Sequence, residues 1–437
     1  MRAVRFIALS CITGLLISAC SSDDNKVEIS REGRVSVLQL EQSLRPDITD
    51  AERIIRVPPP RAIAAWPTSG GNATHSLGHV ALAATLEEKE RHDIGEGTRN
   101  AVPLAAPVVV GNRVFALDAA AQVTAFDSVT GNTTWTVDLL PESEDTPPSF
   151  GGLAHSGNLL IVAAGFNEVV ALNPDTGSVI WRTNLPAPVR SAPTVANNRV
   201  YAVTLDNELF ALHASDGKKL WQHGGLTGGA MLIGGSSPAV MDDTVLAAYS
   251  SGELFALRPE NGRVLWSESL AAVNRVNAAA SLTDITASPV VLDDAVYSIG
   301  HSGRLVAINR LNGRKLWERE IGGVTTPWVA GEFLFVLTNN AQLLCLNRLS
   351  GKIFWLTQLD KFEDKEDKKD PITWTAPILA GDRLLLGGSN GQLLAVSPYT
   401  GGVLGSIEQS APLLTAPIVA NRTLYLLRQD GVLAVFR

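Results

Sequence analysis

A short apolar phrase with a small residue near its centre recurs eight times and constrains the fold more than any other feature of the sequence. The small residue is alanine seven times and cysteine once, and successive copies lie 38 to 51 residues apart. The eight positions are Ala125, Ala171, Ala211, Ala256, Ala307, Cys345, Ala395 and Ala434. A self-similar period of this size is typical of architectures in which each repeat packs on its neighbours.

A tryptophan follows the small residue by ten positions in the first six copies. These residues are Trp135, Trp181, Trp221, Trp266, Trp317 and Trp355. Gly405 takes that place in the seventh copy, and a proline usually precedes the small residue by eighteen positions. The block from proline to tryptophan therefore has a constant length, and the variation lies in the connection from each tryptophan to the next proline.

Each block divides into four short apolar segments separated by turn residues. In the third copy the segments are 192–196, 199–204, 208–213 and 218–223, with turns at Asn197-Asn198 and Asp216-Gly217. Four short antiparallel strands per repeat are typical of a propeller blade. The sequence therefore predicts an all-β fold, an eight-bladed β-propeller of four-stranded antiparallel blades, with each tryptophan on an outer strand covering the seam to the next blade.

The eighth repeat supplies only three predicted strands before Arg437. A propeller avoids an open sheet edge by closing its ring. The segment Ala62–Gly71 contains Trp66 and precedes the first block. We predict that this N-terminal segment forms the fourth strand of the last blade, with Trp66 in the missing tryptophan position, so that the propeller spans 62–437.

The N-terminus has the pattern of an export signal. Arg2 and Arg5 precede an apolar run that is too short to span a bilayer. The run ends in Ile-Ser-Ala before Cys20, which resembles the lipobox of bacterial lipoproteins and implies a signal peptide over 1–19 and a lipid on Cys20. Ser21 in the next position favours the outer membrane in that class, and 20–61 reads as a polar, proline-containing tether.

Composition excludes several classes of function. The formal net charge of −8 provides no basic field for phosphate, so nucleic acid is not an expected partner. Three cysteines give no disulfide framework. His75 and His79 are four residues apart, but Gly78 and the lack of a third ligand argue against a metal site.

The blade phrase at 171–181 resembles the quinoprotein-type propeller repeat. Together with the lipobox, the eight repeats and the loop at 281–291, the chain resembles the BamB family of lipoproteins in the outer-membrane β-barrel assembly (BAM) complex. The resemblance implies a non-catalytic protein without a cofactor, anchored in the outer membrane and facing the periplasm. It also implies binding to the POTRA region of BamA, contact with other BAM subunits, and assistance to unfolded outer-membrane β-barrel proteins.

The resemblance places BamA contacts in two connections between blades, at 230–233 and 283–286. Leu232 and Asp284 keep residues of the family, whereas Ile233 replaces an arginine and Thr286 replaces a second aspartate. The implied partner-binding residues are Leu232, Ile233, Asp284 and Thr286. The two substitutions predict a contact that is more apolar than the family's own. For Asp284 the alternative is a residue that only accepts hydrogen bonds from local backbone.

Two other functions are compatible with the repeat. One is a quinoprotein dehydrogenase, which uses a similar repeat but needs a quinone and a calcium ion with acidic ligands; the sequence offers no calcium-loop pattern. The other is a periplasmic scaffold unrelated to barrel assembly. The charged stretch Asp360–Asp370 is predicted to be a solvated surface loop, with an electrostatic contact to a partner as its functional alternative.

Overall fold

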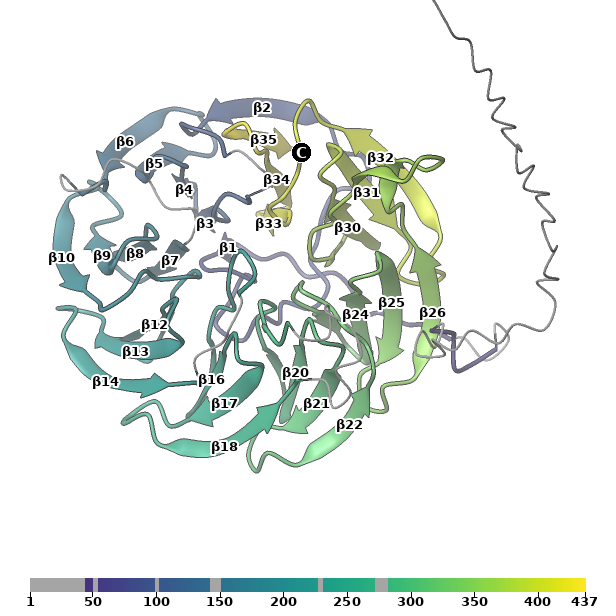
Figure 1. The fold of residues 1–437 in the computed structure, drawn as a ribbon. Coiled ribbons are helices and arrows are strands. Elements are labelled where there is room, and N and C mark those ends of the chain that lie inside the picture. Colours follow the sequence, from purple (N-terminus) through teal and green to yellow (C-terminus); the bar gives the residue numbers. More distant parts are fainter. Residues whose placement is uncertain (1–43, 50–53, 99–101, 142–150, 227–230, 272–281) are drawn as a thin grey trace, which may run out of the picture. The chain divides into compact units, whose positions relative to one another are not determined.

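Short strands and tight turns alternate along the chain in the computed structural model, which describes residues 44–49, 54–98, 102–141, 151–226, 231–271 and 282–437. These residues contain no helix, and so none long and apolar enough to cross a membrane. The region 45–437 is one unit whose sheets form a ring of eight blades (Figure 1). The predicted fold class is confirmed. The predicted signal peptide, Cys20 and most of the tether lie outside the described residues.

Blades 1 to 4 each contain four consecutive antiparallel strands, from the axis outward. They are β3 (Val108–Val110), β4 (Arg113–Leu117), β5 (Gln122–Asp127) and β6 (Thr133–Asp138); β7 (Gly152–Ser156), β8 (Leu159–Ala163), β9 (Glu168–Leu172) and β10 (Val179–Asn184); β11 (Thr194–Ala196), β12 (Arg199–Val203), β13 (Glu208–His213) and β14 (Lys219–Gly224); β15 (Ala239–Met241), β16 (Thr244–Ala248), β17 (Glu253–Leu257) and β18 (Val264–Ser269).

Blades 5 to 7 repeat this order, and blade 8 contributes three strands from the C-terminal region. They are β19 (Val290–Leu292), β20 (Ala295–Ile299), β21 (Leu305–Asn309) and β22 (Lys315–Arg319); β23 (Trp328–Ala330), β24 (Phe333–Leu337), β25 (Gln342–Asn347) and β26 (Ile353–Gln358); β29 (Ile378–Ala380), β30 (Arg383–Gly387), β31 (Gln392–Val396) and β32 (Val403–Glu408); β33 (Ile418–Ala420), β34 (Thr423–Leu427) and β35 (Val432–Phe436).

The six tryptophans of the repeat connect each of the first six blades to the next blade, as predicted. Each indole N–H of the first six blades donates to a backbone carbonyl in the following blade, over 2.6 to 3.1 Å. The ring also lies against the glycine of the following turn. At Gly401, for example, φ is +75° and an added Cβ would lie 2.7 Å from the Trp355 ring, so only glycine allows this approach.

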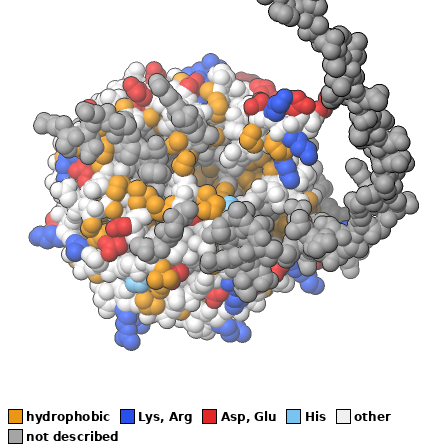
Figure 2. Space-filling view, in the orientation of Figure 1, with side chains coloured by type: hydrophobic (Ala, Val, Ile, Leu, Met, Phe, Trp, Pro, Cys, Tyr) orange, Lys and Arg blue, Asp and Glu red, His pale blue; other side chains and the backbone are white. Residues whose placement is uncertain are grey.

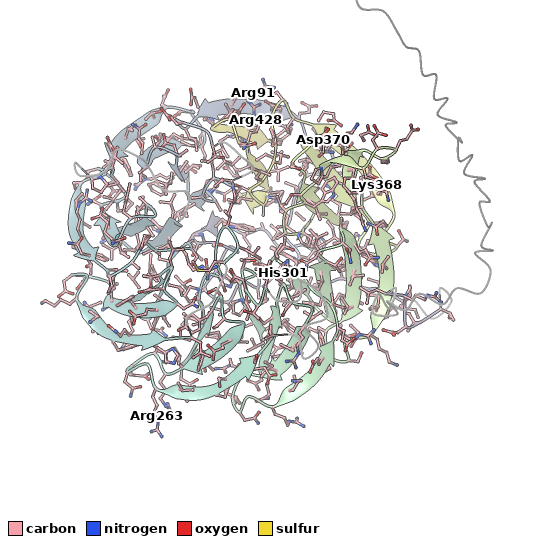
Figure 3. All side chains as sticks on the ribbon, viewed as in Figure 1. Arg91, Arg263, His301, Lys368, Asp370 and Arg428 are labelled. Atoms are coloured by element: carbon pink, nitrogen blue, oxygen red, sulfur yellow. The ribbon has the colours of Figure 1, made fainter. Side chains whose placement is uncertain are left out.

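Ring closure uses a different N-terminal strand from the predicted one. The fourth strand of blade 8 is β2 (Glu88–Asp93), which pairs antiparallel with β35 and lies on the outer rim (Figure 1). Arg91 pairs with Ala434 and so occupies the tryptophan position; its side chain projects outward at the rim (Figure 3). The prediction that Ala62–Gly71 supplies this strand, with Trp66 in that position, is therefore wrong, although closure by an N-terminal strand is correct.

The closing seam between blades 8 and 1 replaces the indole with two other side chains. The Arg437 guanidinium donates to the Ser128 carbonyl over 2.7 Å, which is the carbonyl that a tryptophan would reach. The His92 ring packs on Phe126, with ring centroids 4.6 Å apart, and covers Gly131. Arg437 thus supplies the hydrogen bond of the missing indole, and His92 supplies its packing against the glycine.

Trp66 belongs instead to a segment that crosses the propeller axis. Its short strand β1 (Ala65–Trp66) pairs with the innermost strand of blade 1. From Ile63 to Val80 this segment, which we call the axial segment, exchanges hydrogen bonds with all eight blades. Trp66 is almost fully buried and stacks on Trp328, with centroids 6.2 Å apart. The axial segment therefore ties the inner strands together at the centre of the ring.

The two histidines of the axial segment bind backbone groups. His75 Nδ1 lies 2.8 Å from the Pro289 carbonyl. His79 Nδ1 lies 2.7 Å from the Pro58 carbonyl, and its Nε2 accepts from the Asp382 N–H at 3.0 Å. Both nitrogens of His79 are therefore in use within the protein. In the part of the chain that the structure describes, no group of three potential metal ligands comes together.

Burial lowers the pKa of His75 from 6.5 to about 4. Because the unfolded state takes up the proton first, stability from neutral His75 is present above pH 6.5 and is lost as the pH falls toward 4. The loss reaches about 3 kcal/mol. We expect His75→Asn, which suits the positive φ of 55°, to flatten the decline in urea-unfolding free energy between pH 7.5 and 4.5. Equal declines in both proteins would contradict this expectation.

The charged stretch after blade 6 is more ordered than predicted. Strands β27 (Phe362–Asp364) and β28 (Lys369–Pro371) form a two-stranded hairpin. The indole of Trp374 anchors its base by donating to the Asp360 carbonyl over 2.8 Å. Local pairing and this buried anchor explain why a sequence of mostly charged residues forms a hairpin and not an irregular loop.

Candidate partner-binding surface

Three consecutive connections between blades meet around one buried ion pair. Arg190 lies between β10 and β11, Leu232 lies between β14 and β15, and Asp284 lies between β18 and β19. The Leu232 N–H donates to Asp284 Oδ2 over 2.9 Å. The connections that hold Leu232 and Asp284, which lead into consecutive blades, are therefore neighbours.

The ion pair joins Arg190 and Asp284 in the interior. Arg190 Nη2 lies 3.2 Å from Asp284 Oδ1 and 3.0 Å from Oδ2. The side chains are 1% and 0% exposed, respectively. The guanidinium also donates to the Gly234 carbonyl, from Nε over 3.3 Å and from Nη2 over 3.0 Å. Asp284 thus binds the backbone of the connection at Leu232, and Arg190 binds it at Gly234.

Burial decides what Asp284 can do. A carboxylate that no solvent reaches cannot form a direct salt bridge across a rigid interface, and taking it out of water is tolerated only because Arg190 and the Leu232 N–H satisfy it. Asp284 therefore acts as a positioning residue for the Leu232 connection. The structure places it beneath the predicted surface and not on it.

The outer side of these connections is apolar. Met231 and Ile233 are exposed, Ile233 by 57%, and Leu232 is half-buried between them. Thr286 Oγ1 donates over 3.0 Å to the carbonyl of Val324, another exposed apolar residue. We call Met231, Leu232, Ile233, Thr286 and Val324 the connection patch. None of them carries a formal charge. Ala230, which the family resemblance also implicated, lies outside the described residues.

A cavity of about 660 Å³ adjoins the ion pair. Arg190, Gly234 and Gly235 contribute to its wall, together with Asp118 and Ser69 of the axial segment. Burial raises the pKa of Asp118, although its carboxylate accepts backbone N–H bonds from Glu96, Ala120 and Gln122 over 2.7 to 2.9 Å. This acid is therefore satisfied by its own turn, and its position indicates a structural role.

Arg190, which lies beneath this surface, is not marked by any sequence motif, and neither is Val324 of the connection patch. Nothing in Pro188–Ser191 repeats in other connections or distinguishes its arginine from a surface residue. The available signal was indirect: an aspartate expected beside an apolar connection needs a cation once it is buried. His301 lies close by near the ring centre (Figure 3), and its N–H donates over 3.1 Å to the Asp284 carbonyl.

Figure 2 shows hydrophobic side chains around the middle of the visible face and lysine and arginine side chains at its margin. A central apolar region within a charged margin resembles the arrangement of many protein–protein interfaces. The exposed apolar residues of the connection patch, Met231, Ile233 and Val324, suit an apolar contact with a protein partner.

Two relatives of the same name align with most of this sequence. An outer membrane protein assembly factor BamB from Shewanella oneidensis is 25% identical over 366 residues, covering 82% of this chain and 90% of the relative. One from Yersinia pestis is 29% identical over 361 residues, covering 78% and 86%. Both names describe assembly factors and not enzymes.

Solved structures share the fold. BamB from Moraxella catarrhalis superimposes with a TM-score of 0.68 at 19% identity, covering 81% of this chain and all of that one. A quinohemoprotein alcohol dehydrogenase from Comamonas testosteroni gives 0.67 at 14% identity, covering 85% and 80%. At these identities the likeness shows the propeller alone, and it is shared by an assembly factor and an oxidoreductase.

The family model described as outer membrane protein assembly factor BamB matches residues 122–357, which is more than half of the chain. The matched region runs from blade 1 to blade 6 and includes Arg190, Leu232 and Asp284. With its eight blades, this chain belongs to the BamB family of outer membrane protein assembly factors.

Proposed function

We propose that this protein is a non-catalytic lipoprotein of the BAM complex that binds the POTRA region of BamA through the connection patch. In this proposal Cys20 carries the lipid and holds the protein at the outer membrane, facing the periplasm. The propeller brings BamA and unfolded β-barrel proteins together, and so assists folding and insertion. The observation that carries the proposal is the apolar patch fixed by the Arg190–Asp284 pair.

The form of the patch supports a protein ligand. Its two most exposed members, Met231 and Ile233, flank Leu232, whose backbone is fixed by Asp284. Apolar side chains on a preorganised backbone lose little conformational entropy on binding and can form the desolvated centre of an interface. An extended edge or a helix of the partner fits such a surface.

Charge contributes little to the expected contact. The five residues of the connection patch have no ionisable side chain, and Arg190 and Asp284 neutralise each other below them. Salt screens exposed charges over about 10 Å at 0.1 M, so a contact without such charges changes little when salt is added. We expect the affinity for BamA to vary little between low and moderate ionic strength.

The deciding experiment is a binding assay between the purified protein and the periplasmic region of BamA. We expect Leu232→Asp with Ile233→Asp to weaken binding at least tenfold, because two carboxylates would be desolvated in the interface. A matched control is Val179→Asp with Ile180→Asp, which places the same charges on exposed residues of β10. Unchanged melting temperatures would show that both variants are folded.

The control is expected to bind BamA as the unaltered protein does. Normal binding by a folded Leu232/Ile233 variant would move the interface away from the connection patch. The charged hairpin β27–β28 would then be the next surface to test. Strong salt dependence of the unaltered protein would point to the same hairpin, where exposed ion pairs join Lys365 to Asp360 and Lys369 to Asp367.

A further inference from the structure

The seam between blades 7 and 8 lacks the indole that fills six other seams. Gly405 in β32 pairs with Ala395, in the register in which Trp355 pairs with Cys345 one blade earlier. No turn joins β35 to its neighbour, because β2 comes from the other end of the chain. The partner groups that hold an indole at the other seams are therefore arranged differently here.

The missing indole leaves an open space. By strand alternation, the side chains on the same face of blade 7 as residue 405 are those of Leu385, Leu393, Ala395 and Ile407. They line a cavity of about 350 Å³, together with Arg383, Leu404 and the segment Ala84–Leu86 that leads into β2. Ala395 is only half-buried, whereas the small residue at the seven equivalent positions is fully buried.

The other seams show what this space fits. Phe335, which stands in the register of Leu385, packs on Trp355 with ring centroids 6.1 Å apart. The same contact recurs between Tyr201 and Trp221 at 6.0 Å. Blade 7 therefore has the same apolar wall against which an indole packs in these blades. Leu385 stands there in the position of Phe335 and Tyr201. Apolar cavities of about half this volume bind a single benzene ring.

One charged side chain, Arg383, lies in the cavity wall, which also contains the hydroxyl residues Thr85 and Ser406. Arg383 crosses the seam and donates from Nη1 to the Ala84 carbonyl over 2.5 Å, and from Nη2 to the Ala83 carbonyl. Burial lowers the pKa of this guanidinium. A planar cation held beside leucine and isoleucine side chains provides a favourable surface for an aromatic ring.

The rim favours a side chain of a polypeptide over a small molecule. Leu404 is 59% exposed, compared with 46% for Ile180 and 43% for Leu220, which hold the same register in other blades. Val403 beside it is 57% exposed. A free aromatic molecule inside the cavity would leave both side chains in water. Residues that flank an inserted ring in a polypeptide would cover them.

We propose that this cavity, the aromatic socket, binds a tryptophan or another planar aromatic side chain of a polypeptide. The identity of that polypeptide rests on the proposed function: transmembrane β-barrels carry girdles of aromatic residues, so unfolded barrel chains present such side chains. The aromatic socket lies on blades 7 and 8, whereas the connection patch lies on the connections into blades 4 to 6. One protein could therefore hold BamA and a client chain at separate surfaces.

The test follows methyl NMR signals of the full-length protein during titration. The probes are a blocked heptapeptide of glycine and serine with a central tryptophan, the same peptide with central alanine, and free indole. We expect the tryptophan peptide to shift the methyl signals of Leu385, Leu393 and Ile407 and to bind at least tenfold more tightly than the alanine peptide. Ala395→Phe fills the cavity and should abolish these shifts.

Leu349→Phe is the matched control, because it adds a phenyl ring at an exposed position outside the socket. It should bind the peptide normally. The proposal is overturned if the tryptophan peptide does not bind, if it binds Ala395→Phe equally well, or if indole binds and the peptide does not. Binding to BamA is measured in parallel and should be unchanged in a folded Ala395→Phe protein, so failure of the socket and failure of the proposed function are distinguishable.

Discussion

Replacing Arg190 with methionine is expected to lower the free energy of unfolding by about 3–5 kcal/mol, the range measured when one member of a buried pair is removed. Methionine preserves much of the apolar volume but leaves Asp284 charged, fully buried and held only by the Leu232 N–H. The Gly234 carbonyl loses its donor as well. Urea unfolding at pH 7 measures the change directly.

A double replacement separates charge from packing. Arg190→Met with Asp284→Leu removes both charges, and we expect it to recover most of the lost stability, since apolar substitutes for a buried pair are often tolerated. Arg182→Met is the matched control, because Arg182 pairs with Glu168 at a partly exposed site, where such pairs contribute at most about 1 kcal/mol. If Arg190→Met costs no more than Arg182→Met, the buried pair does not hold the connections as described.

The same double variant bears on binding. It keeps an apolar interior, but Leu232 loses the acceptor for its N–H. We therefore expect a stable protein whose connection patch is less well ordered. Weaker binding to BamA without a loss of stability would separate the positioning role of Asp284 from its contribution to folding.

Trp66→Ala is expected to be similarly severe, at about 3–5 kcal/mol, the usual cost of truncating a buried tryptophan. The ring is 3% exposed and stacks on Trp328, whose own indole N–H holds the axial segment at the Gly78 carbonyl over 2.8 Å. Loss of the ring leaves a cavity where the axial segment meets the inner strands. Thermal and urea unfolding of the purified protein would report the change.

The companion variant Trp66→Phe keeps an aromatic ring on Trp328 and should cost much less. Trp135→Ala provides a second comparison, because Trp135 lies at the rim and is only half-buried. We expect its loss to be smaller than that of Trp66. A Trp66→Ala protein that unfolds like the unaltered one would show that the axial segment is dispensable.

The blades could be predicted because every repeat has the same sequence pattern. Apolar periodicity, turn residues and the tryptophan register recur together, so each copy supports the others. The closing strand lacks this pattern. Glu88–Asp93 consists of charged residues and a histidine, and its inward face uses Glu88, Glu90 and His92. No apolar alternation marks it as a strand. The segment that does contain a tryptophan, Trp66, belongs to the axial segment and not to the closing strand.

The candidate site was predictable in part for a similar reason. The connections of Leu232 and Asp284 lead into consecutive blades and are for that reason expected side by side, and the hydrogen bond between these residues confirms it. Burial could not be read from the sequence, because an isolated aspartate in a connection looks the same whether it faces solvent or a buried arginine. The role of Asp284 thus depends on Arg190, which lies 94 positions earlier in the chain.

Closure by β2 has a consequence for how the chain folds. Arg91 and Ala434 pair across almost the whole propeller, so the contact order of the last sheet is very high. Open arrays of repeats fold from any local nucleus and propagate unit by unit. This ring cannot finish in that way: β2 has no partner strand until the C-terminal residues arrive, and the axial segment needs inner strands from all eight blades. Completion is therefore a late, cooperative event, and an incomplete chain exposes an unpaired edge until its final strand docks.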